Sequence, residues 1–327
     1  MGFVQIKKQV VGIDIDIQIT TIAVVDIRGN IIATMDFPTD AYPDASEYIA
    51  TLCEKVVALV EDNGGYESIR SVGVSAPSAN YLSGSIENAA NLPWKGVIPL
   101  AAIMRDRLGI SVAVANDCHV SALGESVFGS AHGMKNFVVM LLGYSGVGSC
   151  FFSNGHPHLG TDGFAGEIGH TALIDNGRQC GCGKKGCLET YTSVKGILLT
   201  VKELLESSSV PSLLRGCELK NLADVFAACD KGDVIAIEAM KRSGDSLGRG
   251  LANYASVLDP EAIILTGEAA QGGKWLLDPL LDSFETHVFH NIRDKVKIVV
   301  SHLNDKDRRV LGASALACDV KEYSLFK

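Results

Sequence analysis

The chain has 327 residues, of which 47% are hydrophobic and 20% charged, and its formal net charge is −9. This length and composition predict about two globular domains, and the acidic balance argues against a basic face for nucleic acid. Residues 1–8 lack the apolar core of a signal peptide, no apolar run suits a membrane span, and the odd count of nine cysteines fits a reducing compartment, so we expect a cytoplasmic protein.

The first part of the chain reads as strands around one amphipathic helix. Five short apolar runs predict buried strands: 10–15, 21–26, 31–37, 69–74 and 112–115. Residues 45–61 carry apolar side chains at helical spacing, and Gly64-Gly65 ends that helix. The last of the strands runs directly into Asn116-Asp117.

The same layout then begins again. Residues 137–142 predict a buried strand, 143–148 a small-residue loop and 149–152 a second strand, followed by a turn at Ser153-Asn154-Gly155. This order repeats that of residues 10–37, so we expect two similarly built domains that face each other.

The remaining elements alternate. Helices are expected at 234–257 and 310–318, and strands at 262–265 and 297–300. Such alternation predicts largely parallel sheets covered by helices, with binding groups at the carboxyl ends of strands. Asp14, Asp117 and Gly143 occupy such ends.

Three cysteines, Cys180, Cys182 and Cys187, lie close together in a glycine-rich run that follows His170. Closely spaced thiolates select zinc, and one imidazole completes a tetrahedral set with no open position. We therefore predict a structural zinc; the alternative is three incidental thiols in a glycine-rich loop. Spacing leaves other histidines open as the fourth ligand: His119, His156 and His158.

Asn116-Asp117 and two glutamates form a candidate polar site. Asp117 can accept the proton of a substrate hydroxyl during phosphoryl transfer, or it can cap a helix at 119–128, and spacing does not separate these roles. Glu167 and Glu189 flank the cysteines, so a zinc that fixes this loop would also fix both carboxylates. Carboxylates and an amide suit a polyhydroxylated ligand, because they accept hydroxyl hydrogens.

Six segments closely resemble the ROK family of repressors, uncharacterised frames and sugar kinases: 91–95 (Asn-Leu-Pro-Trp-Lys), 116–117, 163–170, 180–190, 258–261 (Leu-Asp-Pro-Glu) and 312–315. The Gly-Glu-Ile-Gly-His and Cys-Gly-Cys-Gly-Lys-Lys-Gly-Cys segments are highly specific in combination, and the chain is similar to the bacterial glucokinase-like members. The resemblance implies the α/β actin-like hexokinase ATPase fold, with a cleft between two domains: 1–117 plus 311–327, and 118–310 with the zinc knuckle.

The resemblance also implies an activity and its residues. ATP with Mg²⁺ would phosphorylate a glucose-like hexose at the 6-hydroxyl, with Asp117 as general base. The implied sugar ligands are Asn91, Asn116, Asp117, Glu167, His170 and Glu189. The implied nucleotide contacts are Asp14, Ser145, Gly146, Gly148 and Gly267. The implied zinc ligands are His170, Cys180, Cys182 and Cys187. The implied partners are a small-molecule sugar and a second copy of the chain, with neither nucleic acid nor membrane.

One loop departs from the family pattern. The first phosphate loop of the family usually reads Asp-x-Gly-Gly-Thr, whereas this chain reads Asp14-Ile15-Asp16-Ile17-Gln18. Glycines let the backbone approach phosphate closely, but Asp16 brings a negative charge and Ile17 adds bulk. We therefore expect weak nucleotide affinity.

Three functions are compatible with these segments. The first is a working hexose kinase with an unusual loop, which we favour. The second is a catalytically impaired sugar-binding or regulatory protein, because the Asp16-Ile17-Gln18 segment is degenerate. The third is a repressor, which in this family carries a helix-turn-helix domain ahead of the first strand; the first strand here begins by residue 10, so we do not expect it.

Overall fold

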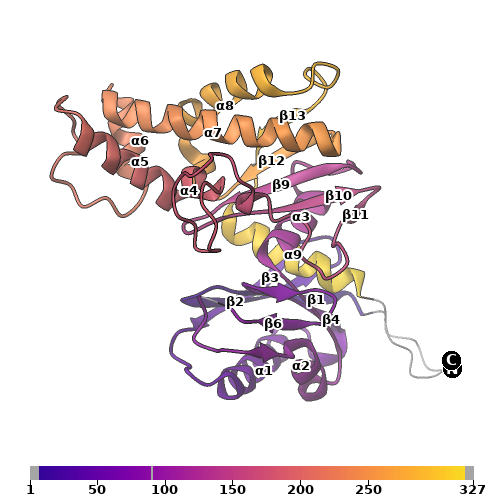
Figure 1. The fold of residues 1–327 in the computed structure, drawn as a ribbon. Coiled ribbons are helices and arrows are strands. Elements are labelled where there is room, and N and C mark those ends of the chain that lie inside the picture. The colour runs from indigo at the N-terminus through magenta and orange to yellow at the C-terminus, as the bar shows by residue number, and fades with distance from the viewer. Residues whose placement is uncertain (1–6, 90, 321–327) are drawn as a thin grey trace. The chain divides into compact units, whose positions relative to one another are not determined.

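The computed structural model describes residues 7–89 and 91–320, which form two compact units (Figure 1). Unit 1 comprises Met1–Gly133, Leu159–Phe164 and His302–Lys327, and unit 2 comprises Met134–His158 and Ala165–Ser301.

These boundaries differ from the expected 1–117 plus 311–327 and 118–310, because residues 118–133, 159–164 and 302–310 belong to unit 1. Helix α3 (Asp117–Phe128) packs on α9 (Asp305–Asp319), and α9 packs on the sheet of unit 1. Residues 1–6 and 321–327 of the expected first domain lie outside the described residues.

The sheet of unit 1 has the strand order β3-β2-β1-β4-β8. Its strands are β1 (Gln9–Ile15), β2 (Ile19–Asp26), β3 (Ile31–Pro38), β4 (Ile69–Ser75) and β8 (Ser111–Ala115). The first three are antiparallel, and β1, β4 and β8 are parallel. The carboxyl ends of β1 and β8, which carry Asp14 and lead into Asn116-Asp117, therefore lie at one edge.

Helices cover both faces of this sheet. Val11, Ile13 and Ile15 alternate into a core with α1 (Ala45–Glu61) and α2 (Leu100–Leu108). Val10 and Gly12 face α9 instead, and a Cβ on Gly12 would lie 2.3 Å from the Val310 carbonyl oxygen. Figure 1 shows α1 and α2 on one side of the sheet and α9 on the other. A bare glycine thus lets α9 lie close to the strand that carries Asp14.

Smaller elements complete unit 1: the 3₁₀ turn Tyr66–Ser68 and a second sheet of β5 (Ala79–Asn80), β6 (Ser85–Glu87) and β7 (Val97–Ile98). The loop between β6 and β7 holds the predicted ligand Asn91. Trp94 anchors this loop, since it is buried against Tyr48 and its indole N–H donates to the Tyr42 carbonyl at 2.9 Å.

The sheet of unit 2 has the order β11-β10-β9-β12-β13, with three antiparallel strands followed by two parallel ones. Its strands are β9 (Phe137–Leu142), β10 (Val147–Ser153), β11 (His156–Pro157), β12 (Ala262–Thr266) and β13 (Lys297–Val300). This is the arrangement of unit 1, so the prediction of a repeated layout is confirmed. His156-Pro157 forms the short edge strand of this sheet.

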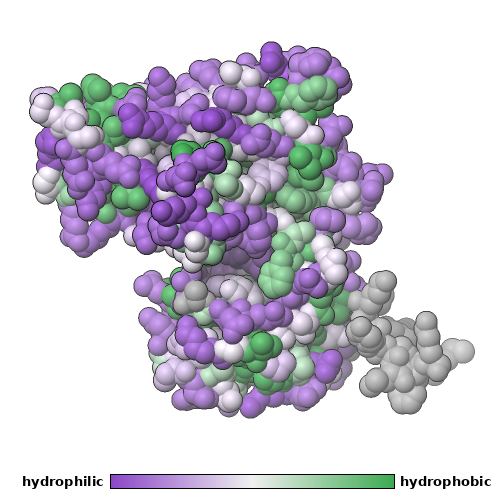
Figure 2. All heavy atoms as spheres, viewed as in Figure 1, coloured by the Kyte–Doolittle hydropathy of each residue, from purple (hydrophilic) through white to green (hydrophobic). Residues whose placement is uncertain are grey.

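The helices of unit 2 are α4 (Glu189–Thr192), α5 (Val194–Ser207), α6 (Ala223–Asp230), α7 (Val234–Leu258) and α8 (Lys274–His287), with 3₁₀ turns at Ile168–His170 and Ala269–Gly272. Val138, Met140 and Leu142 of β9 pack into the core that these helices form. The visible surface of each unit is mainly hydrophilic (Figure 2). Among the described helices, none combines the length and hydropathy needed to cross a membrane.

Candidate functional site

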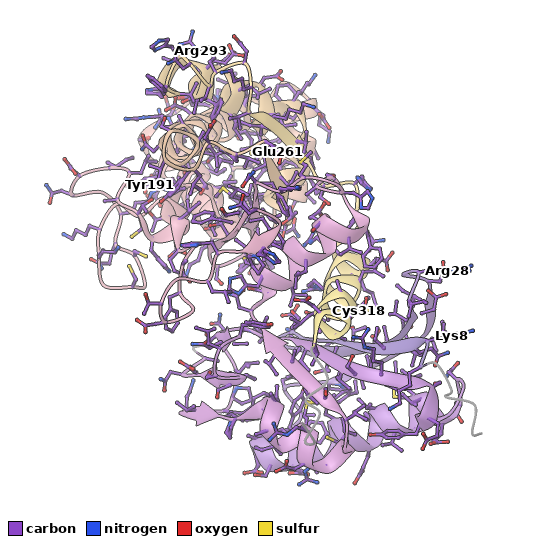
Figure 3. All side chains as sticks on the ribbon, turned by 90° about the vertical axis from the view of Figure 1, so that its right-hand side faces the viewer. Lys8, Arg28, Tyr191, Glu261, Arg293 and Cys318 are labelled. Carbon is purple, nitrogen blue, oxygen red and sulfur yellow. The ribbon has the colours of Figure 1, made fainter. Side chains whose placement is uncertain are left out.

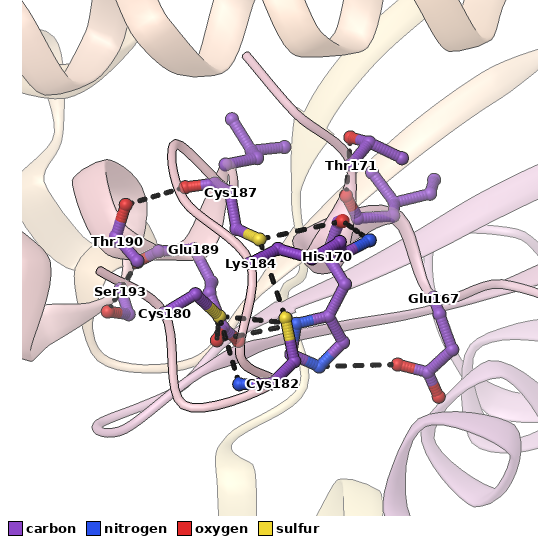
Figure 4. Close-up of polar contacts among 12 residues, drawn as sticks. Glu167, His170, Thr171, Cys180, Cys182, Lys184, Cys187, Glu189, Thr190 and Ser193 are labelled. Carbon is purple, nitrogen blue, oxygen red and sulfur yellow. Dashed lines mark hydrogen bonds and ion pairs between the residues drawn. The ribbon is translucent and has the colours of Figure 1, made fainter. Parts of the chain in front are cut away.

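Unit 2 brings together the four predicted metal ligands, His170, Cys180, Cys182 and Cys187 (Figure 4). Their ligand atoms all lie within 4.8 Å of one another. The Sγ atoms of Cys182 and Cys187 are 3.7 Å apart, and Cys180 Sγ is 3.6 Å from His170 Nδ1. Tetrahedral zinc with Zn–S bonds of about 2.3 Å would separate two sulfurs by about 3.8 Å, so the donor set fits zinc. Among the described residues, the histidine beside the thiols is His170, not His119, His156 or His158.

The backbone of the knuckle curls at two glycines. Gly183 and Gly186 have φ of 90° and 77°, values that glycine adopts without a Cβ penalty. A Cβ on Gly186 would lie 1.7 Å from the Ile174 carbonyl oxygen, so no other residue fits there without a shift of the chain. Lys184 Nζ donates to the His170 carbonyl at 2.6 Å and ties the knuckle to its histidine. The Lys184 backbone N–H lowers the pKa of Cys182 to about 7, which favours the thiolate that metals bind.

Arg178 supports the knuckle, a role that was not predicted from the sequence. Its Nη1 donates to the carbonyls of Thr190 at 2.7 Å and Gly196 at 3.0 Å, and its Nη2 donates to Thr200 Oγ1 at 2.9 Å. Its guanidinium also stacks 4.7 Å from the ring centre of Tyr191, which is labelled in Figure 3. These contacts fasten the start of the cysteine loop to α4 and α5.

Two carboxylates adjoin the histidine, as Figure 4 shows. Glu189 Oε1 lies 2.9 Å from Cys180 Sγ and 3.5 Å from His170 Nδ1. Glu167 Oε2 lies 3.8 Å from His170 Nε2. Glu189 is mostly buried and Glu167 is half exposed, so unit 2 presents Glu167 and one ring edge of His170 to solvent.

The loop between β9 and β10 holds the implied nucleotide contacts Ser145 and Gly146 and lies at the carboxyl ends of β9 and β12. Gly146 leaves room for the sugar-ligand candidate Glu189, since a Cβ on Gly146 would lie 2.9 Å from Glu189 Oε2. Gly148, expected in the loop, lies within β10 opposite Leu141, because pairing with β9 begins at Val147. Ser145 remains in the connecting loop, and Gly267 directly follows β12 with φ of 90°.

In unit 1, Asn116 rather than Asp117 caps α3. Asn116 Oδ1 accepts the His119 N–H at 2.8 Å, so the capping role proposed for Asp117 falls to its neighbour. Asp117 is the first helical residue, and its Oδ1 accepts the Cys118 N–H at 2.8 Å. Burial raises the pKa of the Asp117 carboxyl, while that N–H and Arg309 oppose the rise. A partly desolvated carboxylate with a raised pKa is a suitable proton acceptor.

Asp14 lies at the same edge of the sheet as Asp117 and is almost fully buried. Arg309 Nε lies 3.1 Å from Asp14 Oδ2, and Arg309 Nη1 lies 2.9 Å from Asp16 Oδ2. Desolvation nevertheless raises the pKa of Asp14 to about 6, with Arg309 and Ser75 acting in the opposite direction.

The raised pKa predicts a pH-dependent stability. The folded chain favours the protonated form of Asp14 more than the unfolded chain does. The contribution of Asp14 to the free energy of unfolding is therefore greatest below pH 3.8 and is lost as pH rises through about 6. Asp14→Asn should remove this loss. We expect the variant to gain about 2–3 kcal/mol of unfolding free energy relative to the parent between pH 4 and 7.

Urea unfolding across that pH range measures the difference between variant and parent. Asp36→Asn is the control, because the ion pair of Asp36 with Lys306 lowers the pKa of Asp36 and gives the opposite sign. A difference between Asp14→Asn and the parent that stays constant with pH would show that Asp14 is not desolvated.

The segment Leu258–Glu261 has a structural task in unit 2. Asp259 ends α7 in the left-handed region with φ of 44°. Glu261, labelled in Figure 3, accepts the N–H groups of Lys135 at 2.8 Å and Asn136 at 3.0 Å through Oε1. These bonds fix the start of β9 beside β12. They give Glu261 a structural role that requires no bound ligand.

Comparisons with known proteins agree with these features. A family model described as the ROK family matches residues 10–320. A glucokinase of Halalkalibacterium halodurans is 30% identical over 315 residues, which cover 94% of each chain.

Solved structures show the same fold. A ROK family glucokinase from Streptomyces griseus in complex with glucose and AMPPNP is 27% identical, with a TM-score of 0.77 and coverage of 95% of this chain and 100% of that one. A ROK family transcriptional regulator, a homologue of the E. coli MLC protein, is 23% identical, with a TM-score of 0.85 and coverage of 95% and 78%. The predicted fold class, an actin-like hexokinase fold of two α/β domains, is thereby confirmed.

Proposed function

The chain belongs to the ROK family, and from that premise we propose that it transfers the γ-phosphoryl group of ATP to the 6-hydroxyl of a glucose-like hexose. The observation that carries the proposal is Asp117, a desolvated carboxylate held at the carboxyl end of β8 by the Cys118 N–H while Asn116 caps the helix. The glucokinase relatives support the hexose as substrate class.

In the proposed reaction, Asp117 accepts the proton of the sugar hydroxyl. The hydroxyl oxygen bonds to the γ-phosphorus of ATP, and the bond between the γ-phosphorus and the leaving ADP oxygen breaks. Magnesium bound with ATP would supply positive charge for the phosphates. Asp117 lies in the first turn of α3, where the helix favours the ionised carboxylate before transfer.

Further polar side chains would hold the other hydroxyls. We propose Asn91, Asn116, Glu167, His170 and Glu189 as sugar ligands and zinc at the cysteine cluster as their support. The zinc would fix the ring of His170, and through it the two adjoining carboxylates, because both glutamates approach that ring within 3.8 Å. Free thiols and ATP coexist in the cytoplasm, where we place the protein.

The nucleotide side of the proposal rests on fewer contacts. Ser145, Gly146 and Gly267 lie at the carboxyl ends of β9 and β12, where phosphates bind in such folds. Gly148 lies inside β10, so it would contribute by letting the backbone approach the phosphates closely. We propose Asp14 as a further nucleotide contact.

A second function is favoured by one specific observation. The Ile17 N–H, which a phosphate loop would offer to an anion, donates to Asp16 Oδ1 at 2.6 Å. If ATP cannot displace that carboxylate, the chain is a sugar-binding protein without turnover.

A coupled assay of ADP release over a panel of hexoses and N-acetylhexosamines tests the proposal. We expect sugar-dependent ADP release, greatest with a glucose-like hexose, and a homodimer by light scattering under the same conditions. Sugar binding without ADP release from any member of the panel would instead support the second function.

A further inference from the structure

The turn between β1 and β2 carries its own anion. Residues 16–18 connect the strands, and the Asp16 N–H donates to the Ile19 carbonyl at 3.2 Å. Asp16 Oδ1 accepts the Ile17 N–H at 2.6 Å. The Asp16 carboxylate thus occupies a donor that a glycine-containing loop would leave for a phosphate oxygen.

Arg309 holds the other oxygen of the same carboxylate. Its Nη1 lies 2.9 Å from Asp16 Oδ2, and its Nε lies 3.1 Å from Asp14 Oδ2. The guanidinium therefore bridges the end of β1 and the turn that follows it, with different nitrogens on the two carboxylates. This fork geometry is one that lysine cannot reproduce.

The fold delivers Arg309 to this position. Gly12 and Gly73 lack the Cβ atoms that would collide with α9, at 2.3 Å from the Val310 oxygen and 2.0 Å from the Ala313 oxygen. Arg309 directly precedes Val310 in α9 and lies about one helical turn before Ala313. It therefore reaches the carboxyl ends of the strands. Its side chain is about one-third exposed, so part of it remains open to solvent.

We propose that Arg309 is a nucleotide-phosphate ligand and that Asp16 is an internal competitor for it. The inference rests on the proposed function, because it concerns the phosphate side of the same site. A phosphate that enters the turn would take over both partners of Asp16, the Ile17 N–H and Arg309 Nη1, while Asp14 keeps the arginine in place. The competition would make nucleotide affinity weak without removing the positive charge that phosphate needs.

Four variants test this with Mg·AMPPNP as the titrant in calorimetry. Asp16→Gly should raise affinity about tenfold or more, because a charged hydrogen bond no longer has to be displaced. The single variant Arg309→Ala should bind Mg·AMPPNP more weakly than the parent. The affinity of the double variant should fall below that of Asp16→Gly by a larger factor, about tenfold or more, because in Asp16→Gly the Nη1 of Arg309 no longer pairs with Asp16. Arg309→Lys, which keeps the charge but not the fork, should lie between the parent and Arg309→Ala.

Lys306→Ala is the matched control. It removes one positive charge from the same helix and breaks an ion pair of 2.8 Å with Asp36 of β3, but it leaves Arg309 and both of its carboxylate partners in place. We expect its affinity for Mg·AMPPNP to stay within about twofold of the parent. Thermal unfolding and glucose titration on every variant confirm that the fold and the sugar side are unchanged.

The outcomes separate the inference from the proposed function. Unchanged or tighter Mg·AMPPNP binding by a folded Arg309→Ala overturns the phosphate role of Arg309, even if the chain is a kinase. Unchanged binding by Asp16→Gly overturns the competition. A complete lack of Mg·AMPPNP binding by the parent and by Asp16→Gly, with glucose still bound, contradicts the inference and the use of ATP together.

Discussion

Asp117→Asn should lower kcat for sugar phosphorylation by about 10³-fold, within the range that a general base contributes, while the sugar dissociation constant changes less than about threefold. An amide has the shape of the carboxylate but cannot accept the hydroxyl proton. Its oxygen can still accept the Cys118 N–H at the start of α3, and Asn116 still caps the helix.

Asp44→Asn is the matched control for this substitution. Asp44 also begins a helix, where its Oδ1 accepts the N–H groups of Ser46 and Glu47 at 2.9 Å, but that helix is α1, which follows β3 rather than β8. Steady-state rates should therefore match the parent. Undiminished turnover by Asp117→Asn would remove Asp117 from the mechanism.

Cys182→Ala should abolish zinc binding and weaken sugar affinity about tenfold or more. Three remaining ligands hold zinc poorly, and His170 with its two adjoining glutamates then loses the support that orients it; charge-assisted hydrogen bonds to hydroxyls of the sugar depend on that orientation. Metal analysis of the purified parent should give about one zinc per chain.

Cys217→Ala provides the comparison. Cys182 and Cys217 are both exposed, but only Cys182 belongs to the cluster. Cys217→Ala should keep the zinc, the thermal stability and the sugar affinity of the parent. A parent protein free of zinc after purification without chelators, or full sugar affinity in a zinc-free Cys182→Ala, would refute the supporting role of the metal.

Several elements could be predicted because their signals are local. The helix at 45–61 has the observed bounds, since Asp44 caps it and apolar residues repeat at helical spacing. The strand at 137–142 also matches, because it is continuously apolar and buried on both faces. The metal ligands are recognisable for the same reason, as three of them lie within one short glycine-rich segment.

Other elements carried weaker or overlooked signals. Helix α9 begins at Asp305 rather than 310, because its first turns are polar and Arg309 makes ion pairs instead of joining an apolar stripe. Helix α5 has Val194, Ile197, Val201 and Leu204 on its buried face, at the spacing that is typical of an amphipathic helix. The helices α2 and α6 span only 9 and 8 residues, which is too short for their apolar residues to establish a helical period.

The pairing of Arg309 with Asp16 could not be predicted from the sequence. The two residues are 293 positions apart, and their contact depends on how closely α9 lies on β1. The sequence shows Asp16 in a loop where glycine is usual. Only the packing of α9 at Gly12 shows that Arg309 is the cation that pairs with Asp16. Long-range contacts of this kind depend on the whole unit, whereas caps and metal knuckles are set by neighbours in the chain.

The most direct test of the proposed activity is phosphorus NMR of a reaction that contains the zinc-loaded protein, glucose and Mg·ATP. We predict a new phosphomonoester resonance, coupled to the two protons of the sugar's C6 methylene, that grows as the γ-phosphate signal of ATP declines. Unchanged ATP signals after prolonged incubation, in a sample where calorimetry shows glucose bound, would contradict the assignment as a hexose kinase.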